Sequence, residues 1–143
     1  MSTEYLTFKV SNQNFCLPLL NIKEIITHRE SSPVPGSPGF VEGVIYLREE
    51  LITVVDTKTI FNIFDDVAPT HIVILDFTEG YLGLSVDAIE GVVKAEDTDF
   101  NDMNKLFSKG SHYLNGVVKV KDRLFNSFSI SALNEIISED AND

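Results

Sequence analysis

Apolar and polar residues alternate along much of this chain, which is the pattern of β-strands that bury one face. Residues 5–10 show the period of two clearly, and short apolar runs bounded by turn-forming residues repeat the signal along the sequence. The pattern predicts strands at residues 5–10, 15–20, 22–26, 43–47, 51–55, 72–77, 81–86, 89–93, 116–120 and 124–128. We therefore expect a mostly β protein.

Helical spacing is confined to two short segments, and each follows a residue that can cap a helix. Asp56 precedes a short helix through residues 60–63, and Ser129 precedes a last helix. The side-chain oxygens of Asp and Ser can accept hydrogen bonds from the free N–H groups of a first helical turn. The last helix has apolar residues on one face, Ile130, Leu133, Ile136 and Ile137. That face predicts a docked helix, whereas residues 95–111 read as polar and irregular.

The second half of the chain repeats the order of the first half. Gly43 and Asp56 recur as Gly116 and Ser129, each 73 positions later, around a predicted hairpin. The single domain of residues 1–143 therefore reads as two repeated β lobes, at about residues 1–70 and 71–143. An open sheet of five short strands leaves its edges unpaired, so closure into a small barrel is favoured. We expect an all-β fold of two five-stranded barrels around a shared core, with short helices that include a C-terminal one.

Net charge and the absence of targeting segments limit the kinds of partner, and the location, that we expect for this protein. The chain carries 22 acidic and 11 basic residues, a formal net charge of −11. This balance argues against nucleic acid and anionic membrane surfaces, because both attract clustered Lys and Arg. The start of the chain lacks the basic and apolar regions of a signal peptide, and its apolar runs are far shorter than a membrane span. We expect a cytoplasmic protein that does not insert directly into a membrane.

The residues that usually carry chemistry are sparse. The single cysteine, Cys16, lies in an apolar run and is predicted to be a small buried hydrophobe. His28, His71 and His112 are far apart and lack companions at metal-ligand spacing. Neither a phosphate-binding glycine loop nor a nucleophile elbow is present. The sequence therefore predicts no enzymatic activity, no catalytic residue, no metal and no cofactor.

The first predicted hairpin carries a recognisable motif. Residues 34–48 read VPxxPxxVxGVIYLR, and residues 51–56 read LxxVVD. Residues 15–25 read FxLPLxxIxEI, and residues 82–89 read LGLxVDxI. Together these segments resemble the CheW-like family over essentially the whole chain. The resemblance implies two five-stranded barrels around a shared core. It also implies a non-enzymatic adaptor of bacterial chemotaxis, which joins the cytoplasmic tip of methyl-accepting chemoreceptors to the regulatory domain of the histidine kinase CheA in receptor arrays at the inner membrane.

The same resemblance implies a receptor-binding groove between the barrels, and it assigns no kinase-contact residues. The groove residues carried over to this chain are Ile22, Glu24, Gly43, Arg48 and Gly83. Core packing is the alternative for Ile22, backbone geometry for the two glycines, and an ordinary solvated acid for Glu24. Arg48 is the strongest candidate, because a guanidinium fork can hold a carboxylate or backbone carbonyls at fixed geometry. Its alternative is a local ion pair with the neighbouring acids on the hairpin.

This chain departs from the usual family motif around Arg48. The family usually reads Asn-Leu-Arg-Gly where this chain has Tyr46-Leu47-Arg48-Glu49, and it usually has Pro at the place of Thr53. Two other functions therefore stay compatible with the sequence. One is a CheW-like adaptor in another chemosensory-type pathway. The other is a small-ligand binding protein that uses a cleft between the barrels, lined by acidic and Phe side chains.

Overall fold

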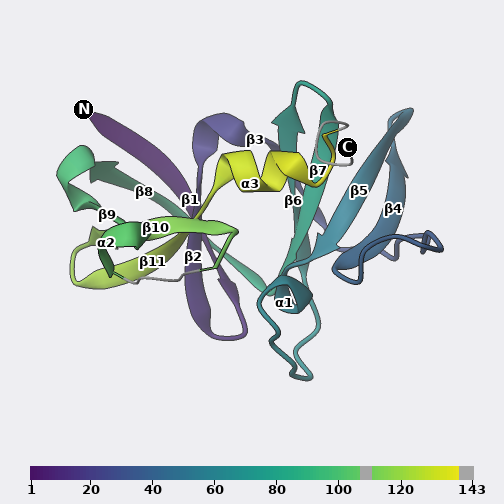
Figure 1. Ribbon diagram of the computed structural model, residues 1–143, viewed down its shortest axis with the longest axis horizontal. Helices are drawn as coiled ribbons and strands as arrows, with labels where there is room; N and C mark the ends of the chain where they lie inside the picture. Colours follow the sequence, from purple (N-terminus) through teal and green to yellow (C-terminus); the bar gives the residue numbers. More distant parts are fainter. Residues whose placement is uncertain (107–110, 139–143) are drawn as a thin grey trace.

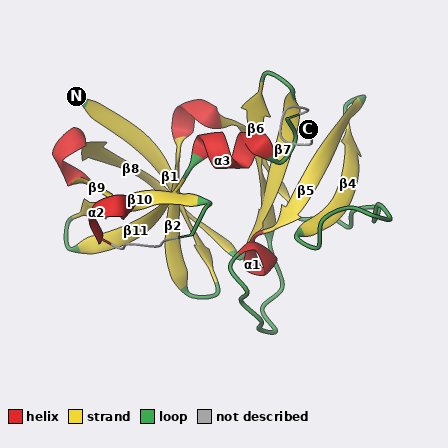
Figure 2. Cartoon of the chain, in the orientation of Figure 1, coloured by secondary structure: helices red, strands yellow, loops and turns green. Residues whose placement is uncertain are grey.

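The computed structural model describes residues 1–106 and 111–138 and shows two curved β-sheets side by side (Figure 1 and Figure 2). The six-stranded sheet has the order β8-β1-β2-β11-β10-β9, and the five-stranded sheet has the order β3-β6-β7-β5-β4. The first contains β1 (Ser2–Val10), β2 (Gln13–Pro18), β8 (Ala88–Glu96), β9 (Phe100–Asp102), β10 (Leu114–Val120) and β11 (Arg123–Phe128). The second contains β3 (Ile22–Thr27), β4 (Val41–Leu47), β5 (Glu50–Asp56), β6 (His71–Phe77) and β7 (Gly80–Val86).

The helices are short and lie between or after strands. They are α1 (Thr57–Ile60), α2 (Met103–Leu106), α3 (Ile130–Glu135) and the 3-10 helices η1 (Leu19–Asn21) and η2 (Asp97–Asp99). The all-β fold class with short helices is confirmed, and every predicted strand is present. The expectation that residues 95–111 are irregular, with helix only after Asp56 and Ser129, is wrong for the described part of this stretch, because η2, β9 and α2 lie there. Residues 107–110 lie outside the described residues. Three-residue β9 is too short to show alternation, and it adds a sixth strand to the sheet that contains β1.

Each sheet takes strands from both halves of the chain. Hairpin β1–β2 pairs with β8 to β11, and hairpin β6–β7 pairs with β3 to β5. In each sheet one of the two pairings between the halves is parallel: β2 lies beside β11 at Phe15↔Asn126, and β7 lies beside β5 at Gly83↔Val54. The other pairings, β1–β8 and β3–β6, are antiparallel. The division into lobes near residue 70 therefore does not match the division into sheets. Periodicity locates strands, but it does not tell which strand each one pairs with.

Three apolar clusters fill the fold, and the largest lies between the two sheets. Its buried members are Leu6, Phe8, Val10, Phe15, Leu17, Val55, Val73, Leu75, Leu82, Leu84, Val86, Phe128 and Leu133. The other two fill the concave sides of the sheets: Ile45, Ile52, Val54, Ile72 and Ile74 in the five-stranded sheet, and Cys16, Ala95, Val118 and Phe125 in the six-stranded one. The expected shared core is confirmed, and Cys16 is buried as expected.

Both predicted helix caps are confirmed. The Asp56 carboxylate accepts a hydrogen bond from the Lys58 N–H at 3.1 Å, and the Ser129 hydroxyl accepts one from the Ala132 N–H at 3.3 Å. Leu133 of α3 is fully buried, and its apolar neighbours on the helix pack on the shared core. Helix α3 lies between the two sheets (Figure 1), so the expected docking of the C-terminal helix is confirmed.

The β4–β5 hairpin closes with a two-residue turn of left-handed backbone. Arg48 has φ 46° and Glu49 has φ 70°, which is the geometry of a type I′ turn. The β10–β11 hairpin repeats it with Lys121 at φ 49° and Asp122 at φ 67°. Residues with a Cβ adopt this conformation at a cost, and Gly adopts it freely. The hairpin therefore holds Arg48 in a fixed, unfavourable backbone conformation.

Glu49 also has left-handed backbone in this turn, a conformation that Gly adopts without cost. Glu49→Gly is therefore expected to stabilise the fold by about 0.5–1 kcal/mol. The matched control is Glu50→Gly, one position later in strand β5, where Gly is expected to destabilise the fold. Urea denaturation of the three proteins measures both effects. A Glu49→Gly protein with a lower midpoint than the parent would contradict the turn geometry.

Candidate binding site

An ion pair joins the two outermost strands of the five-stranded sheet. The Arg48 guanidinium, in the β4–β5 turn, contacts the Glu24 carboxylate on β3. Strands β3 and β4 are at opposite ends of the sheet order, so the sheet curves far enough to bring its edges together here. The alternative, a local ion pair of Arg48 with the acids beside it on the hairpin, does not match the structure, because its partner comes from another strand. Local sequence could not reveal this, since Glu24 and Arg48 meet only through sheet curvature.

The ion pair borders a shallow depression of about 220 Å³ at this end of the sheet. Its lining residues are Lys23, Glu24, Leu47, Arg48, Glu50, Ile52 and Tyr81. The Lys23 ammonium lies 4.8 Å from the centre of the Tyr81 ring, a cation–π contact. The rim therefore combines two cations, two carboxylates and one aromatic ring. A lining of this mixed kind is more typical of a site that binds a polar protein surface through an apolar side chain than of a pocket for a small apolar ligand.

The same hairpin carries an exposed apolar pair on its other face. Tyr46 on β4 and Leu51 on β5 are directly opposite each other in the hairpin register, and both side chains are exposed. Cross-strand neighbours of this kind contact each other and present one continuous patch. Aromatic side chains are enriched among the residues that carry binding energy at interfaces. The outer face of the hairpin tip therefore carries an exposed apolar patch, on the face opposite to Leu47 and Ile52.

The structure separates the five residues expected to line the groove into two groups. Glu24 and Arg48 are accessible and in contact, with 63% of the Arg48 side chain exposed. Ile22 is partly buried and packs on the shared core, while Gly43 and Gly83 are buried. All five belong to the five-stranded sheet or its hairpin turn, but only Glu24 and Arg48 form an accessible cluster.

Close approach of neighbouring atoms explains both glycines. A Cβ on Gly43 would lie 2.4 Å from the Ser32 carbonyl oxygen, because the segment before β4 bridges to Val44 at this point. A Cβ on Gly83 would lie 2.7 Å from Ile72 Cγ2, inside the concave core of the sheet. These glycines shape the sheet that carries the site, and they do not themselves present a surface.

Sequence reasoning missed most of the residues around the pair, Lys23, Glu50, Tyr46, Leu51 and Tyr81. Tyr81 reaches the site only because β7 lies parallel to β5, with Tyr81 paired to Ile52. A parallel pairing between distant segments leaves no mark in local periodicity. Tyr46 and Leu51 carried a usable signal, since a two-residue hairpin turn places them in register.

The cysteine thiol and two of the histidine rings lie outside this site, in surroundings that are common in protein structures. Burial raises the pKa of the Cys16 thiol to about 12, so the thiol is neutral and unreactive. His28 lies 3.3 Å from a Glu42 carboxylate oxygen, and His112 lies 2.9 Å from one of Glu135. Within the described residues, no three side chains of His, Cys, Asp or Glu gather as metal ligands would. In the same part of the chain, no helix is long and apolar enough to cross a membrane.

The packing around Gly83 gives a direct test of the sheet geometry at the site. Gly83→Ala is expected to destabilise the fold by about 1–3 kcal/mol, because its Cβ would overlap Ile72 in a filled core. Gly91→Ala, on β8, is the control, because a Cβ there has no atom within 4 Å. Urea denaturation should show a lower midpoint for Gly83→Ala only. Equal midpoints for the two variants would contradict the packing around Gly83.

Comparisons with known proteins agree with the fold and with the sequence motif. A family model described as the CheW-like domain matches residues 4–137. A chemotaxis protein CheW from Thermotoga maritima is 32% identical over 138 residues, which cover 94% of this chain and 89% of that protein. One from Treponema pallidum is 24% identical, covering 81% of this chain and 72% of that protein.

A solved structure supports the same fold. The scaffolding protein TtCheW from Thermoanaerobacter tengcongensis superposes with a TM-score of 0.82 at 22% identity, covering 91% of this chain and 90% of that one. Two curved sheets around a shared core, the motif around Arg48 and the family match over residues 4–137 lead to one assignment. The chain belongs to the CheW-like family, whose members are non-enzymatic.

Proposed function

We propose that this protein is a cytoplasmic scaffold that couples methyl-accepting chemoreceptors to the regulatory domain of the histidine kinase CheA. Membership of the CheW-like family supports a coupling role, and the curated relatives carry the name chemotaxis protein CheW. In this role the protein associates with receptor arrays at the inner membrane through its partners. It binds no nucleic acid, in keeping with its net charge of −11.

The observation that carries the proposal is the accessible Arg48–Glu24 pair. Glu24 engages one side of the guanidinium and orients it, while most of the Arg48 side chain faces solvent. An Arg side chain has five N–H donors in a planar fork, so donors remain for carbonyl or carboxylate groups of a partner. The turn geometry fixes the backbone of Arg48 before binding, which reduces the ordering cost on association. The site is thus suited to hold the tip of a helical receptor.

A ligand-binding role between the sheets has less support. Four phenylalanines are packed against one another in or on the shared core: Phe8, Phe15, Phe61 and Phe128. Phe15 lies with its ring centre 5.3 Å from that of Phe61 and 5.4 Å from that of Phe128. Close-packed rings of this kind fill the space that a bound small molecule would need. The observation therefore favours the scaffold over the ligand-binding protein.

Tyr46 supports a more specific alternative within the same family. Its exposed ring stands where the family usually has Asn, two residues before Arg48 on the same hairpin. A large aromatic side chain at that place alters the shape that a partner must match. An adaptor of another chemosensory-type pathway would use the same site with a different receptor, and binding assays against each receptor fragment of the same organism would separate the two.

Arg48→Ala is expected to weaken binding of a chemoreceptor tip fragment by about 1–3 kcal/mol, because it removes an oriented anchor of the interface. Stability should change by no more than about 1 kcal/mol, because the ion pair is largely exposed. Arg123→Ala is the matched control: its side chain is 49% exposed and contacts Glu90 at 2.9 Å on the other sheet. Titration calorimetry measures all three affinities, with thermal unfolding as the check on folding.

The control decides how a loss of affinity is understood. Weaker binding by Arg48→Ala but not by Arg123→Ala would support a receptor contact at the Arg48–Glu24 pair. Equal affinity of Arg48→Ala and the parent, with both folded, would remove Arg48 from the receptor contact. No binding of any receptor fragment by the parent would argue against the coupling role itself.

A further inference from the structure

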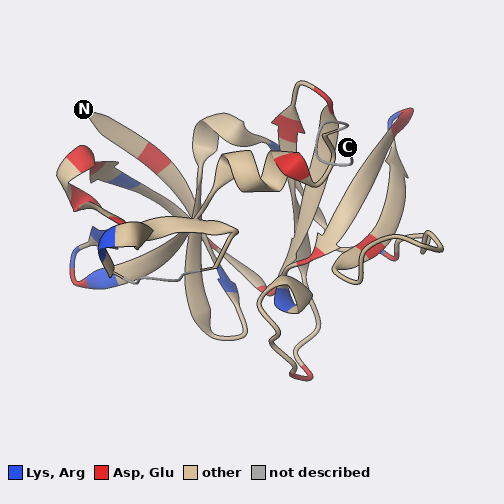
Figure 3. Ribbon diagram, in the orientation of Figure 1, with Lys and Arg blue, Asp and Glu red and all other residues tan. Residues whose placement is uncertain are grey.

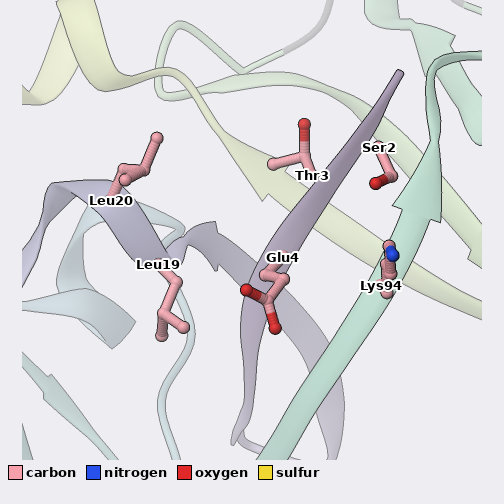
Figure 4. A pocket seen from close by; sticks show the side chains of 6 residues that line it. All are labelled: Ser2, Thr3, Glu4, Leu19, Leu20 and Lys94. Carbon is pink, nitrogen blue, oxygen red and sulfur yellow. The ribbon is translucent and has the colours of Figure 1, made fainter.

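A second surface lies on the six-stranded sheet, where the chain leaves β2. It is a groove of about 510 Å³ lined by Ser2, Thr3, Glu4, Leu19, Leu20 and Lys94. Figure 4 shows Leu19 and Leu20 on one side of strand β1 and Lys94 on the other side, with Glu4 pointing toward Leu19. None of these residues takes part in the Arg48–Glu24 site, so the groove calls for its own explanation.

The floor of the groove is an unpaired strand edge. Strand β1 starts at Ser2, but its pairing with β2 begins only at Tyr5↔Pro18. Beyond Pro18 the chain turns away into η1, while residues 2–4 stay paired with β8 on their other side. In the part of the chain that the structure describes, no strand lies beside residues 2–4 on the groove side. Exposed backbone groups of this kind are a template for another strand.

The alternation of the backbone shows which groups are free. The Met1 carbonyl accepts a hydrogen bond from Asp97 N at 3.1 Å, and the Lys9 carbonyl accepts one from Asp87 N at 2.9 Å, both on the β8 side. In an antiparallel strand successive residues point their N–H and C=O groups to opposite sides. The groups of Thr3 and Tyr5 therefore face β8, while those of Ser2 and Glu4 face the groove.

An apolar wall stands beside this edge. Leu20 is 97% exposed, and Leu19 next to it is partly buried against the shared core. A single exposed Leu is common on protein surfaces. Beside a free strand edge, however, Leu20 can contact an added strand. Every second side chain of that strand would point to the side on which Leu20 lies. The groove thus offers main-chain hydrogen bonds and an apolar contact to the same extended segment.

The charges around the groove select the kind of segment. Acidic residues predominate along β1 and after β8 at this end of the sheet (Figure 3). The charged side chains there are Glu4, Lys94, Glu96, Asp97 and Asp99, and Asp97 also lies 3.6 Å from the amino terminus. With a net charge of −11, a second copy of this chain would be repelled. A cationic segment would be attracted.

We propose that the free edge of β1 at residues 2–4 accepts a short extended segment of another protein by strand addition. The segment is apolar at alternate positions, to contact Leu19 and Leu20, and it carries Lys or Arg to match the acidic surroundings. The strand edge belongs to the other sheet from the Arg48–Glu24 pair, and the two sites share no lining residue. The proposal goes beyond the coupling function and does not depend on which partner binds Arg48.

The probe is a blocked heptapeptide of alternating lysine and valine, titrated into the whole protein and followed by amide NMR. We expect saturable binding with a Kd below about 1 mM. The amide of Glu4 should exchange at least about tenfold more slowly in the complex, while that of Thr3, already bonded toward β8, should not change. Leu20→Asp should abolish binding, whereas Leu124→Asp, which alters a leucine 58% exposed on β11, should leave it unchanged.

Two further peptides keep the test independent of how any variant folds. A heptapeptide N-methylated at alternate amides keeps its side chains but loses donors, so it should not bind. One with glutamate in place of lysine should bind at least about tenfold more weakly. The proposal is overturned by the absence of saturable binding, by equal binding to the Leu20→Asp protein, or by an unprotected Glu4 amide. Concentration-dependent dimers in sedimentation that disappear in Leu20→Asp would also overturn it, because a second copy would then occupy the edge.

Discussion

The exchange of hairpins between the two halves is the constraint on which the rest of the structure depends. Hairpin β1–β2 completes the sheet made by the second half, and hairpin β6–β7 completes the sheet made by the first. Neither half can finish a sheet by itself, and the largest apolar cluster draws on strands from both sheets. The long-range parallel pairings β2–β11 and β5–β7 therefore form together with the shared core, and we expect the chain to fold as one cooperative unit.

An ionic network at the surface adds a second connection between the sheets. The Lys58 ammonium on α1 lies 2.6 Å from Asp65 and 3.2 Å from Asp87, and Asp87 accepts a hydrogen bond from the Ser11 N–H at 2.8 Å. Burial alone would lower the pKa of Lys58, but its hydrogen bonds to Asp65 and Asp87 outweigh burial and raise it. The network links α1 and the β1–β2 turn to the junction of β7 and β8.

The sequence predicted the positions of strands and helices far better than it predicted which strands pair with each other. Alternation located the strands of both repeats, and Asp56 and Ser129 marked two helix starts correctly, because these signals are local. The hairpin exchange was missed, because pairing between distant strands is decided by which arrangement fills the core. At the site, Arg48 was identified through its motif, but its true partner, Glu24, is brought there by sheet curvature. Gly43 and Gly83 belong to the same sheet, yet their roles are in close packing.

A scaffold works by holding partners at a fixed geometry, and this fold supplies that rigidity from its core outward. The most direct measurement is sedimentation velocity of the whole protein in three mixtures. One contains a receptor tip fragment, one contains the kinase regulatory domain, and one contains both. Coupling predicts one species of combined mass that contains all three proteins, and its absence when this chain is left out. Two binary complexes that exclude each other, with no ternary species at saturating concentrations, would contradict the scaffold function.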